Sequence, residues 1–139
     1  MDIHINNAAA KKKKTKIAIV TDAVYPFNKG GKEKRIHEIT ARLAARGYDV
    51  TIYCMKWWAG DEKTIYRDGV KLKAISRFFK LYAGERRSLK QAVLYAFHCL
   101  RLVREEFDII EVDHIPHPAL FAVKLVCLIK RKPMIALWH

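Results

Sequence analysis

The amino-acid sequence predicts an α/β fold: an open, mostly parallel, doubly wound sheet in a single domain. Short apolar runs, each about the length of one strand, alternate along the chain with longer segments of helical periodicity. Several runs are continuously apolar, which is typical of parallel strands that are covered on both faces. The chain has 139 residues, of which 51% are hydrophobic, with only six Gly and four Pro. It can therefore bury a core as one domain.

The first half of the chain predicts a strand, a helix and a second strand. Residues 1–15 lack apolar periodicity and are expected to form a flexible basic N-terminal arm, so the domain spans residues 16–139. Ile17–Val20 predicts the first strand, and Val50–Cys54 predicts the second. Between them, apolar side chains recur at helical spacing until Gly47, which is expected to end the helix. These side chains are Ile36, Ile39, Leu43 and Ala44.

The second half predicts a hairpin, two helices and two further strands. Asp68-Gly69 lies between alternating apolar residues, which is typical of a tight hairpin, here at one edge of the sheet. Asp108–Asp113 and Pro133–Leu137 predict strands, and Pro118–Ile129 predicts a nearly all-apolar helix. The sheet is thus expected to have about five to six strands.

The other helix is expected to follow the hairpin, with Ser88 as its N-cap, and to run to about Arg104. Its apolar side chains recur at three- and four-residue steps, so we expect an amphipathic helix whose other face is basic. These apolar side chains are Leu89, Val93, Ala96, Phe97, Leu100 and Val103.

The chain is strongly basic, with 27 Lys and Arg against 14 Asp and Glu. This charge predicts attraction to nucleic acid, anionic lipid or phosphorylated ligands. Arg86, Arg87 and Lys90, close to apolar residues such as Phe78, resemble a surface for an anionic membrane; a solvated helix face is the alternative. No motif that reads bases is present, so nucleic acid is ranked as an unlikely partner.

The three cysteines, Cys54, Cys99 and Cys127, are odd in number and far apart, which favours a reducing compartment over a disulfide framework. The apolar stretch after the N-terminal lysines is too short for a signal peptide, and Ala119–Ile129 is too short to cross a bilayer. We therefore expect a cytoplasmic protein. Peripheral association with the inner face of the membrane is a second, compatible expectation.

Ligands of open α/β sheets bind beyond the carboxyl ends of the strands, which directs attention to two loops. Gly30 and Gly31 stand at the mouth of the first helix, where backbone N–H groups can approach an anion; a simple turn is the alternative. Asp113, His114 and His117 follow a buried strand and could act as an acid, a base or a sugar-hydroxyl partner. Alternatively, a histidine here caps the next helix or faces water. No metal is expected, because no ligand set accompanies these residues.

Taken together, these residues resemble the N-terminal domain of family 4 glycosyltransferases, which have the GT-B fold. The resemblance runs from about Lys16 to His139. It is carried by Lys16–Asp22, Tyr25-Pro26, Gly30-Gly31-x-Glu33, Leu43–Val50, Asp108–Asp113 with Pro116, and Pro133–His139.

The resemblance implies a Rossmann-like domain that forms one half of a GT-B enzyme. This half binds the acceptor of a retaining glycosyltransferase of hexosyltransferase type, which moves a sugar from a nucleotide-sugar donor to a lipid-linked or saccharide acceptor. The donor domain is not among these 139 residues, so a C-terminal domain or a separate chain would supply it. This chain alone is then not expected to catalyse transfer. The nucleotide-sugar is a substrate, and no cofactor is expected.

The same resemblance implies roles for individual residues. Gly30 and Gly31 would approach the donor diphosphate, and Asp113 with His114 would form the catalytic corner. The acceptor side would include Tyr25, His117 and His139. The alternative is a noncatalytic Rossmann-like module that binds an anionic membrane or partner through its basic face.

Overall fold

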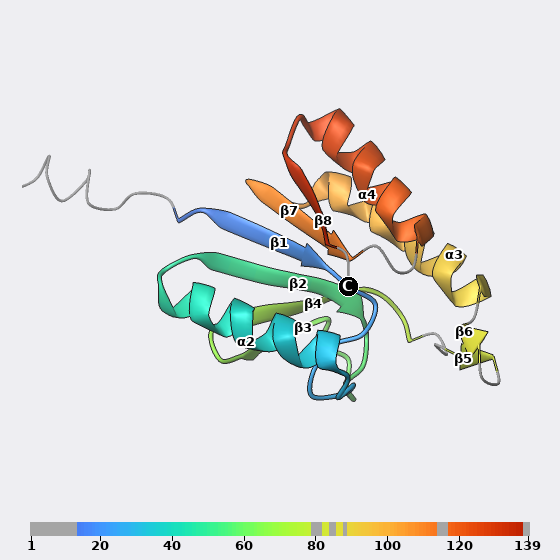
Figure 1. Ribbon diagram of the computed structural model, residues 1–139, viewed down its shortest axis with the longest axis horizontal. Coiled ribbons are helices and arrows are strands. Elements are labelled where there is room, and N and C mark those ends of the chain that lie inside the picture. The colour runs from blue at the N-terminus through green and yellow to red at the C-terminus, as the bar shows by residue number, and fades with distance from the viewer. Residues whose placement is uncertain (1–13, 79–81, 84–85, 88, 114–116, 138–139) are drawn as a thin grey trace, which may run out of the picture.

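The computed structural model confirms the α/β prediction (Figure 1). It describes residues 14–78, 82–83, 86–87, 89–113 and 117–137. A six-stranded sheet has the strand order β3-β4-β2-β1-β7-β8, and only its β3–β4 pair is antiparallel. Its strands are β1 (Lys16–Val20), β2 (Asp49–Met55), β3 (Thr64–Arg67), β4 (Val70–Ser76), β7 (Ile109–Asp113) and β8 (Met134–Leu137).

Helices lie on both faces of the sheet, as Figure 1 shows, so the doubly wound prediction is also confirmed. Side chains of β1 divide between two cores because successive strand residues point to opposite faces. The helical elements are α2 (Gly31–Ala45), α3 (Leu89–Cys99), the 3-10 helix η1 (Leu100–Arg104) and α4 (His117–Lys130). Ile19 belongs to a core with Ile36 of α2, whereas Val20 belongs to a second core with Tyr95 of α3 and Val123 of α4.

Two predicted turns form where the sequence places glycine. Gly47 follows α2 with φ of 95°, a conformation that costs glycine little, and its N–H donates a 3.0 Å hydrogen bond to the carbonyl of Ala44. Asp68 and Gly69 join β3 to β4 with φ values of 49° and 78°, as a tight hairpin turn requires. The hairpin places β3 at the edge of the sheet.

The amphipathic pattern predicted for the helix after the hairpin is wrong. The α-helix ends at Cys99 and continues as η1, and of the predicted apolar stripe only Ala96 is buried, whereas Leu89 and Phe97 are 74% and 73% exposed. The side facing the sheet carries small residues and side chains whose polar atoms have partners inside. They are Gln91, Ala92, Tyr95, Ala96 and Cys99, and the apolar Leu102 of η1 is also buried.

A short antiparallel pair that the sequence does not predict lies between β4 and α3. Its strands are β5 (Tyr82–Ala83) and β6 (Arg86–Arg87). The predicted N-cap Ser88 and the first thirteen residues of the predicted arm lie outside the described residues. All three cysteines are buried and form no disulfide.

Candidate functional site

The carboxyl ends of β1 and β7 meet where the strand order changes direction. β1 pairs with β2 on one side and with β7 on the other, so the chain connections leave this point in opposite directions. Such a switch point is where open α/β sheets form their ligand crevice. Asp22 follows the end of β1 and Asp113 ends β7, and both side chains are buried. Two carboxylates therefore flank the switch point.

Lys32, in the first turn of α2, bridges the two strand ends. Its Nζ lies 2.6 Å from Oδ2 of Asp113 and 3.8 Å from Oδ1 of Asp22. It also lies 3.6 Å from Oε1 of Glu33 on the same turn. The two loops that the sequence singles out thus meet at one edge of the sheet, and a mostly buried ammonium joins them.

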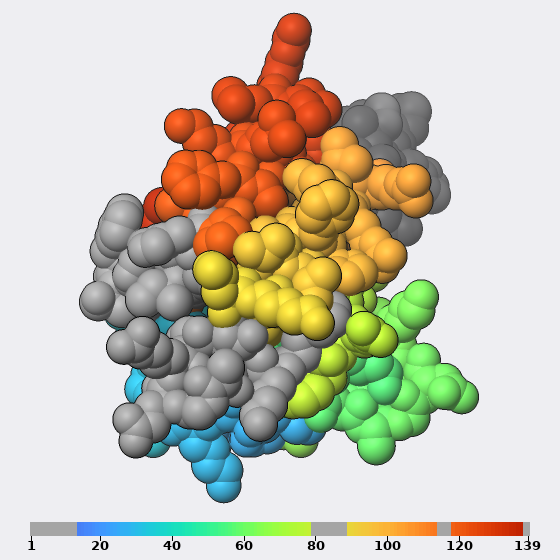
Figure 2. Space-filling model, turned by 90° about the vertical axis from the view of Figure 1, so that its right-hand side faces the viewer, coloured from blue at the N-terminus to red at the C-terminus, as the bar shows by residue number. Residues whose placement is uncertain are grey.

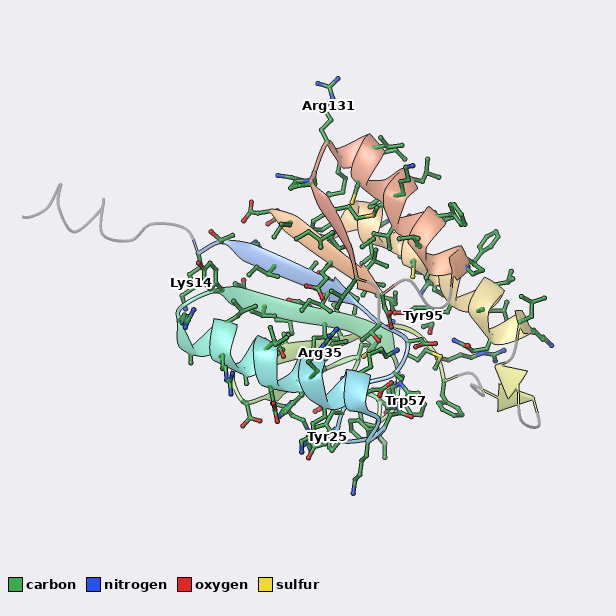
Figure 3. The ribbon with its side chains drawn as sticks, viewed as in Figure 1. Lys14, Tyr25, Arg35, Trp57, Tyr95 and Arg131 are labelled. Atoms are coloured by element: carbon green, nitrogen blue, oxygen red, sulfur yellow. The ribbon has the colours of Figure 1, made fainter. Side chains whose placement is uncertain are left out.

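Hydrogen bonds from Tyr95 of α3 and from Trp57, which follows β2, hold the backbone at the ends of β1 and β2. The hydroxyl of Tyr95 lies 2.9 Å from the carbonyl oxygens of both Thr21 and Tyr53, and it donates its single proton to one at a time. Burial raises the pKa of Tyr95 well above its ordinary value, so the hydroxyl remains a donor. Trp57 donates from Nε1 to the Asp22 carbonyl at 2.8 Å. Figure 3 shows Tyr95 and Trp57 beside these strand ends.

The side chain of Asp22 has a further contact with α3. Nε2 of Gln91 donates to Oδ2 of Asp22 at 3.3 Å, and Gln91 is itself buried. The carboxylate is consequently held from both sides of the sheet, by Lys32 of α2 and by Gln91 of α3. This arrangement fixes the position of a buried carboxylate at the carboxyl edge of the sheet.

The N-terminus of α2 faces open space on one side. Gly30 is the N-cap residue, with φ of −70° and no side-chain cap, and the first helical hydrogen bond runs from the Lys34 N–H to its carbonyl. The preceding N–H groups of the first turn have no partner within the helix and favour anions. A Cβ added to Gly31 would meet no atom within 4 Å, whereas one on Gly30 would collide with the Glu33 carboxylate. Neither glycine has a positive φ, so backbone strain does not require glycine at either position. The two positions differ in the space that a side chain would have.

The remaining site predictions fall in different places. Tyr25 lies in the β1–α2 loop, with its ring 4.8 Å from that of His37, and His37 Nε2 is 3.2 Å from Oδ2 of Asp68. Lys90 is exposed on α3. His114 and His139 lie outside the described residues; for His117, Arg86 and Arg87 only the backbone is described.

Sequence analysis did not identify Asp22, Lys32 or Gln91 as site residues. Asp22 follows an apolar strand closely, and Asp113 is the last residue of another. This similarity to Asp113 is a sequence signal that could have identified Asp22. Lys32 is one of several lysines close to Gly30 and Gly31 in the sequence, and positive charge alone does not single it out. For Gln91 no signal exists in the chain, because only the packing of α3 turns its amide toward Asp22.

A pocket of about 510 Å³ lies away from this site, at the amino ends of β1 and β2. Two lysines in its lining are paired with carboxylates: Lys16 with Glu106 at 2.7 Å and Lys73 with Glu105 at 2.6 Å. Lysine–carboxylate pairs occur at both places, so the switch-point rule is what favours the carboxyl edge as the functional site.

Within the described ranges, no group of three or more His, Cys, Asp or Glu residues is arranged to hold a metal ion. Over the same part of the chain, no helix combines the length and apolar character that a membrane span requires.

Comparison with known proteins identifies one family. The model of the family described as Glycosyltransferase Family 4 matches residues 29–139, which include α2, its first turn and every later element. A search of curated proteins finds no match to the chain.

Proposed function

Because the chain belongs to glycosyltransferase family 4, we propose that it is the acceptor-binding half of a retaining glycosyltransferase. The transferred group is a hexose from a nucleotide-sugar, and the acceptor is a lipid-linked or saccharide hydroxyl. A donor-binding domain, on a C-terminal continuation or a separate chain, would close the other side of the crevice. The nucleotide-sugar is a substrate in this proposal, and no separate cofactor takes part.

One observation carries the proposal: the first turn of α2 and the end of β7 meet at the switch point through Lys32 and Asp113. This edge of the sheet therefore combines backbone N–H donors, an ammonium and carboxylates within one small region. Sugar transfer needs these groups, since a diphosphate gains negative charge as it leaves and hydroxyl groups must be oriented.

The first turn of α2 has the features of a diphosphate site. Its N–H groups and the positive end of the helix dipole stabilise negative charge. The open space beside Gly31 would admit the donor phosphates close to the backbone. We assign to this turn the stabilisation of the departing nucleotide across the crevice.

The opposite corner is formed by the end of β7. Asp113 and the adjacent His114 would contact the transferred sugar or the attacking hydroxyl. The Lys32 ammonium, 2.6 Å away, fixes the orientation of the Asp113 carboxylate. Tyr25, His117 and His139 complete the acceptor side in this proposal.

The test joins this chain to the donor domain of a family 4 enzyme and measures transfer of a radiolabelled sugar from its nucleotide. Gly31→Val should lower transfer by about 100-fold, because the side chain fills the space that the phosphates require. Ala45→Val, at the exposed far end of α2, is the matched control and should retain activity. Full activity of Gly31→Val would overturn the phosphate assignment, and no transfer by any fusion would count against the enzymatic proposal.

A further inference from the structure

The pocket of about 510 Å³ at the amino ends of β1 and β2 lies on a polar half of one sheet face. Val50 and Ile52 of β2 and Leu72 of β4 point to the opposite face, into the core that α2 covers. The residues that alternate with them along β2 and β4 therefore face the pocket. Residues 104–106, at the end of η1, line it on one side and β3 on the other. Figure 2 shows the orange segment with η1 above the green segment with β3.

The strand register arranges the facing side chains in two rows across three strands. β2 and β4 pair in parallel, β4 and β3 pair antiparallel, and the partners in each row lie directly beside one another. The first row is Thr51, Lys71 and Tyr66, and the second is Tyr53, Lys73 and Thr64. Each row thus presents a hydroxyl, an ammonium and a second hydroxyl, which favours a ligand rich in hydrogen-bonding groups.

Tyr53 has a hydroxyl that the fold itself does not use. Its side chain lines the pocket and the residue is 3% exposed, yet the hydroxyl forms no hydrogen bond with any residue that the structure describes. Burial raises the pKa of Tyr53, and the carboxylates of Glu105 and Asp49 add to that shift, so the hydroxyl keeps its proton. Buried hydroxyls normally have a partner, and a ligand in the pocket would supply one.

The charges of the pocket are mixed. Lys73 Nζ lies 2.6 Å from Oε1 of Glu105, and Lys16 Nζ lies 2.7 Å from Oε2 of Glu106. An anionic ligand would meet these carboxylates, and a cationic ligand would meet the ammonium groups. A neutral ligand with several hydroxyls can donate to the carboxylates and accept from the ammonium groups at once. The described charged residues of the lining are Lys16, Lys71, Lys73, Arg104, Asp49, Glu105 and Glu106.

Tyr66 adds a flat apolar surface at the rim. It lies on the edge strand β3, is 69% exposed and lines the pocket. The Nζ of Lys71 is 6.0 Å from the centroid of its ring. A pyranose ring has an apolar face of C–H groups that can pack on such a ring while its hydroxyls reach polar neighbours. A wholly apolar ligand would leave the two rows without partners.

We propose that this pocket binds a neutral saccharide. The two rows and the carboxylates bind its hydroxyls, and Tyr66 packs on one face of a sugar ring. The pocket is at the amino edge of the sheet, whereas Lys32 and Asp113 are at the carboxyl edge, so the bound sugar is held there and is not the group transferred. The inference goes beyond the proposed transfer and does not depend on it.

The experiment follows the amide signals of the 139-residue chain by nuclear magnetic resonance during titration with maltose, cellobiose, lactose and mannobiose. At least one disaccharide should shift the signals of Thr51 and Lys71 and leave that of Lys32 in place. Tyr66→Ala should weaken binding by about tenfold, because the packing surface is lost. Tyr53→Phe should weaken it by about fivefold, which corresponds to one neutral hydrogen bond.

Controls separate binding from structure. Tyr48→Ala removes another exposed tyrosine, one that does not line the pocket, and should bind as the parent does. Lys71→Met should weaken binding by about tenfold, whereas Lys34→Met, on α2, should not change it. Tyr53→Phe should not lower the melting temperature, because its hydroxyl has no partner among the described residues.

Four results would overturn the proposal. One is the absence of shifts with all four disaccharides at millimolar concentration. Another is an equal loss of affinity in Tyr48→Ala. The third is a set of shifts centred on Lys32, which would place the sugar at the carboxyl edge. The fourth is binding of inorganic phosphate without binding of any disaccharide, which would make the pocket an anion site. The titrations need no donor domain, so their outcome is separate from that of the transfer assay.

Discussion

Lys32 and Asp113 form an ion pair of 2.6 Å that connects the first turn of α2 to the end of β7. The two residues are far apart in sequence, and both side chains are largely buried, with 17% and 4% exposed. A buried charge is tolerated when it is paired, so each residue depends on the other for its place at the switch point. The pair therefore links the folding of the domain to the geometry of the candidate site.

Removing the ammonium should destabilise the domain. Lys32→Met leaves Asp113 and Asp22 buried with less positive charge beside them, which is expected to lower the free energy of unfolding by about 3 kcal/mol. Urea denaturation measures this value. Lys34→Met removes an exposed lysine from the same turn and should change stability by less than about 0.5 kcal/mol. Equal effects of the two variants would show that the pair contributes little.

A small substitution at the start of α2 should separate stability from activity. Gly31→Ala adds a methyl group in open space at a helical position, and it should raise the free energy of unfolding by about 0.5 kcal/mol. In the fusion enzyme the same methyl group should lower sugar transfer, because it narrows the approach to the N–H groups. Thermal unfolding and the transfer assay on one preparation measure both effects. A stabilised variant with unchanged transfer would contradict the assigned role.

Much of the fold follows from local sequence patterns. The apolar runs at Ile17–Val20 and Val50–Cys54 are long enough for one strand and lie between polar residues, so their assignment depends on no distant contact. Gly47 and Asp68-Gly69 mark turns because few other residues adopt positive φ at low cost. The sheet order then places the two predicted loops at one edge.

The contacts within the site could not be predicted in the same way, because they depend on how helices rotate against the sheet. Tyr95 and Gln91 look like polar interruptions in an apolar helix, and the periodicity favours burying Phe97 instead. In the structure their polar atoms have partners on Thr21, Tyr53 and Asp22, so Tyr95 and Gln91 are buried. Phe97 is exposed instead. The hydrophobic pattern alone therefore does not show which side of α3 faces the sheet.

The hydroxyl of Tyr95 is expected to stabilise the junction of β1 and β2. Tyr95→Phe removes the donor shared by the carbonyls of Thr21 and Tyr53, and the cost should be about 1–2 kcal/mol in the free energy of unfolding. In this variant the carbonyl of Tyr53 still accepts a 3.1 Å hydrogen bond from the N–H of Thr21. The carbonyl of Thr21 is therefore the group that mainly loses a hydrogen-bond partner. Chemical denaturation tests this value. Tyr66→Phe, on an exposed ring, is the control, and a similar loss there would contradict the explanation.

Glu111 gives the domain a pH dependence of defined sign. Burial raises the pKa of this carboxyl above its ordinary value of 4.5, the nearby Arg35 opposes that shift, and Asp113 adds to it. The folded state therefore holds a proton that the unfolded state has released at the same pH. Stability should fall as the pH rises from the unfolded pKa through the folded one, and the loss remains at neutral pH.

Glu111→Gln removes this titration and should unfold at a higher temperature than the parent at neutral pH. Near pH 4 the two proteins should converge, because the carboxyl is then largely protonated in the folded parent. Melting temperatures recorded across this pH range test the sign directly. Glu38→Gln, on an exposed position of α2, should leave the pH profile unchanged. A parent whose stability instead rises with pH relative to Glu111→Gln would show that Arg35 outweighs burial at this position.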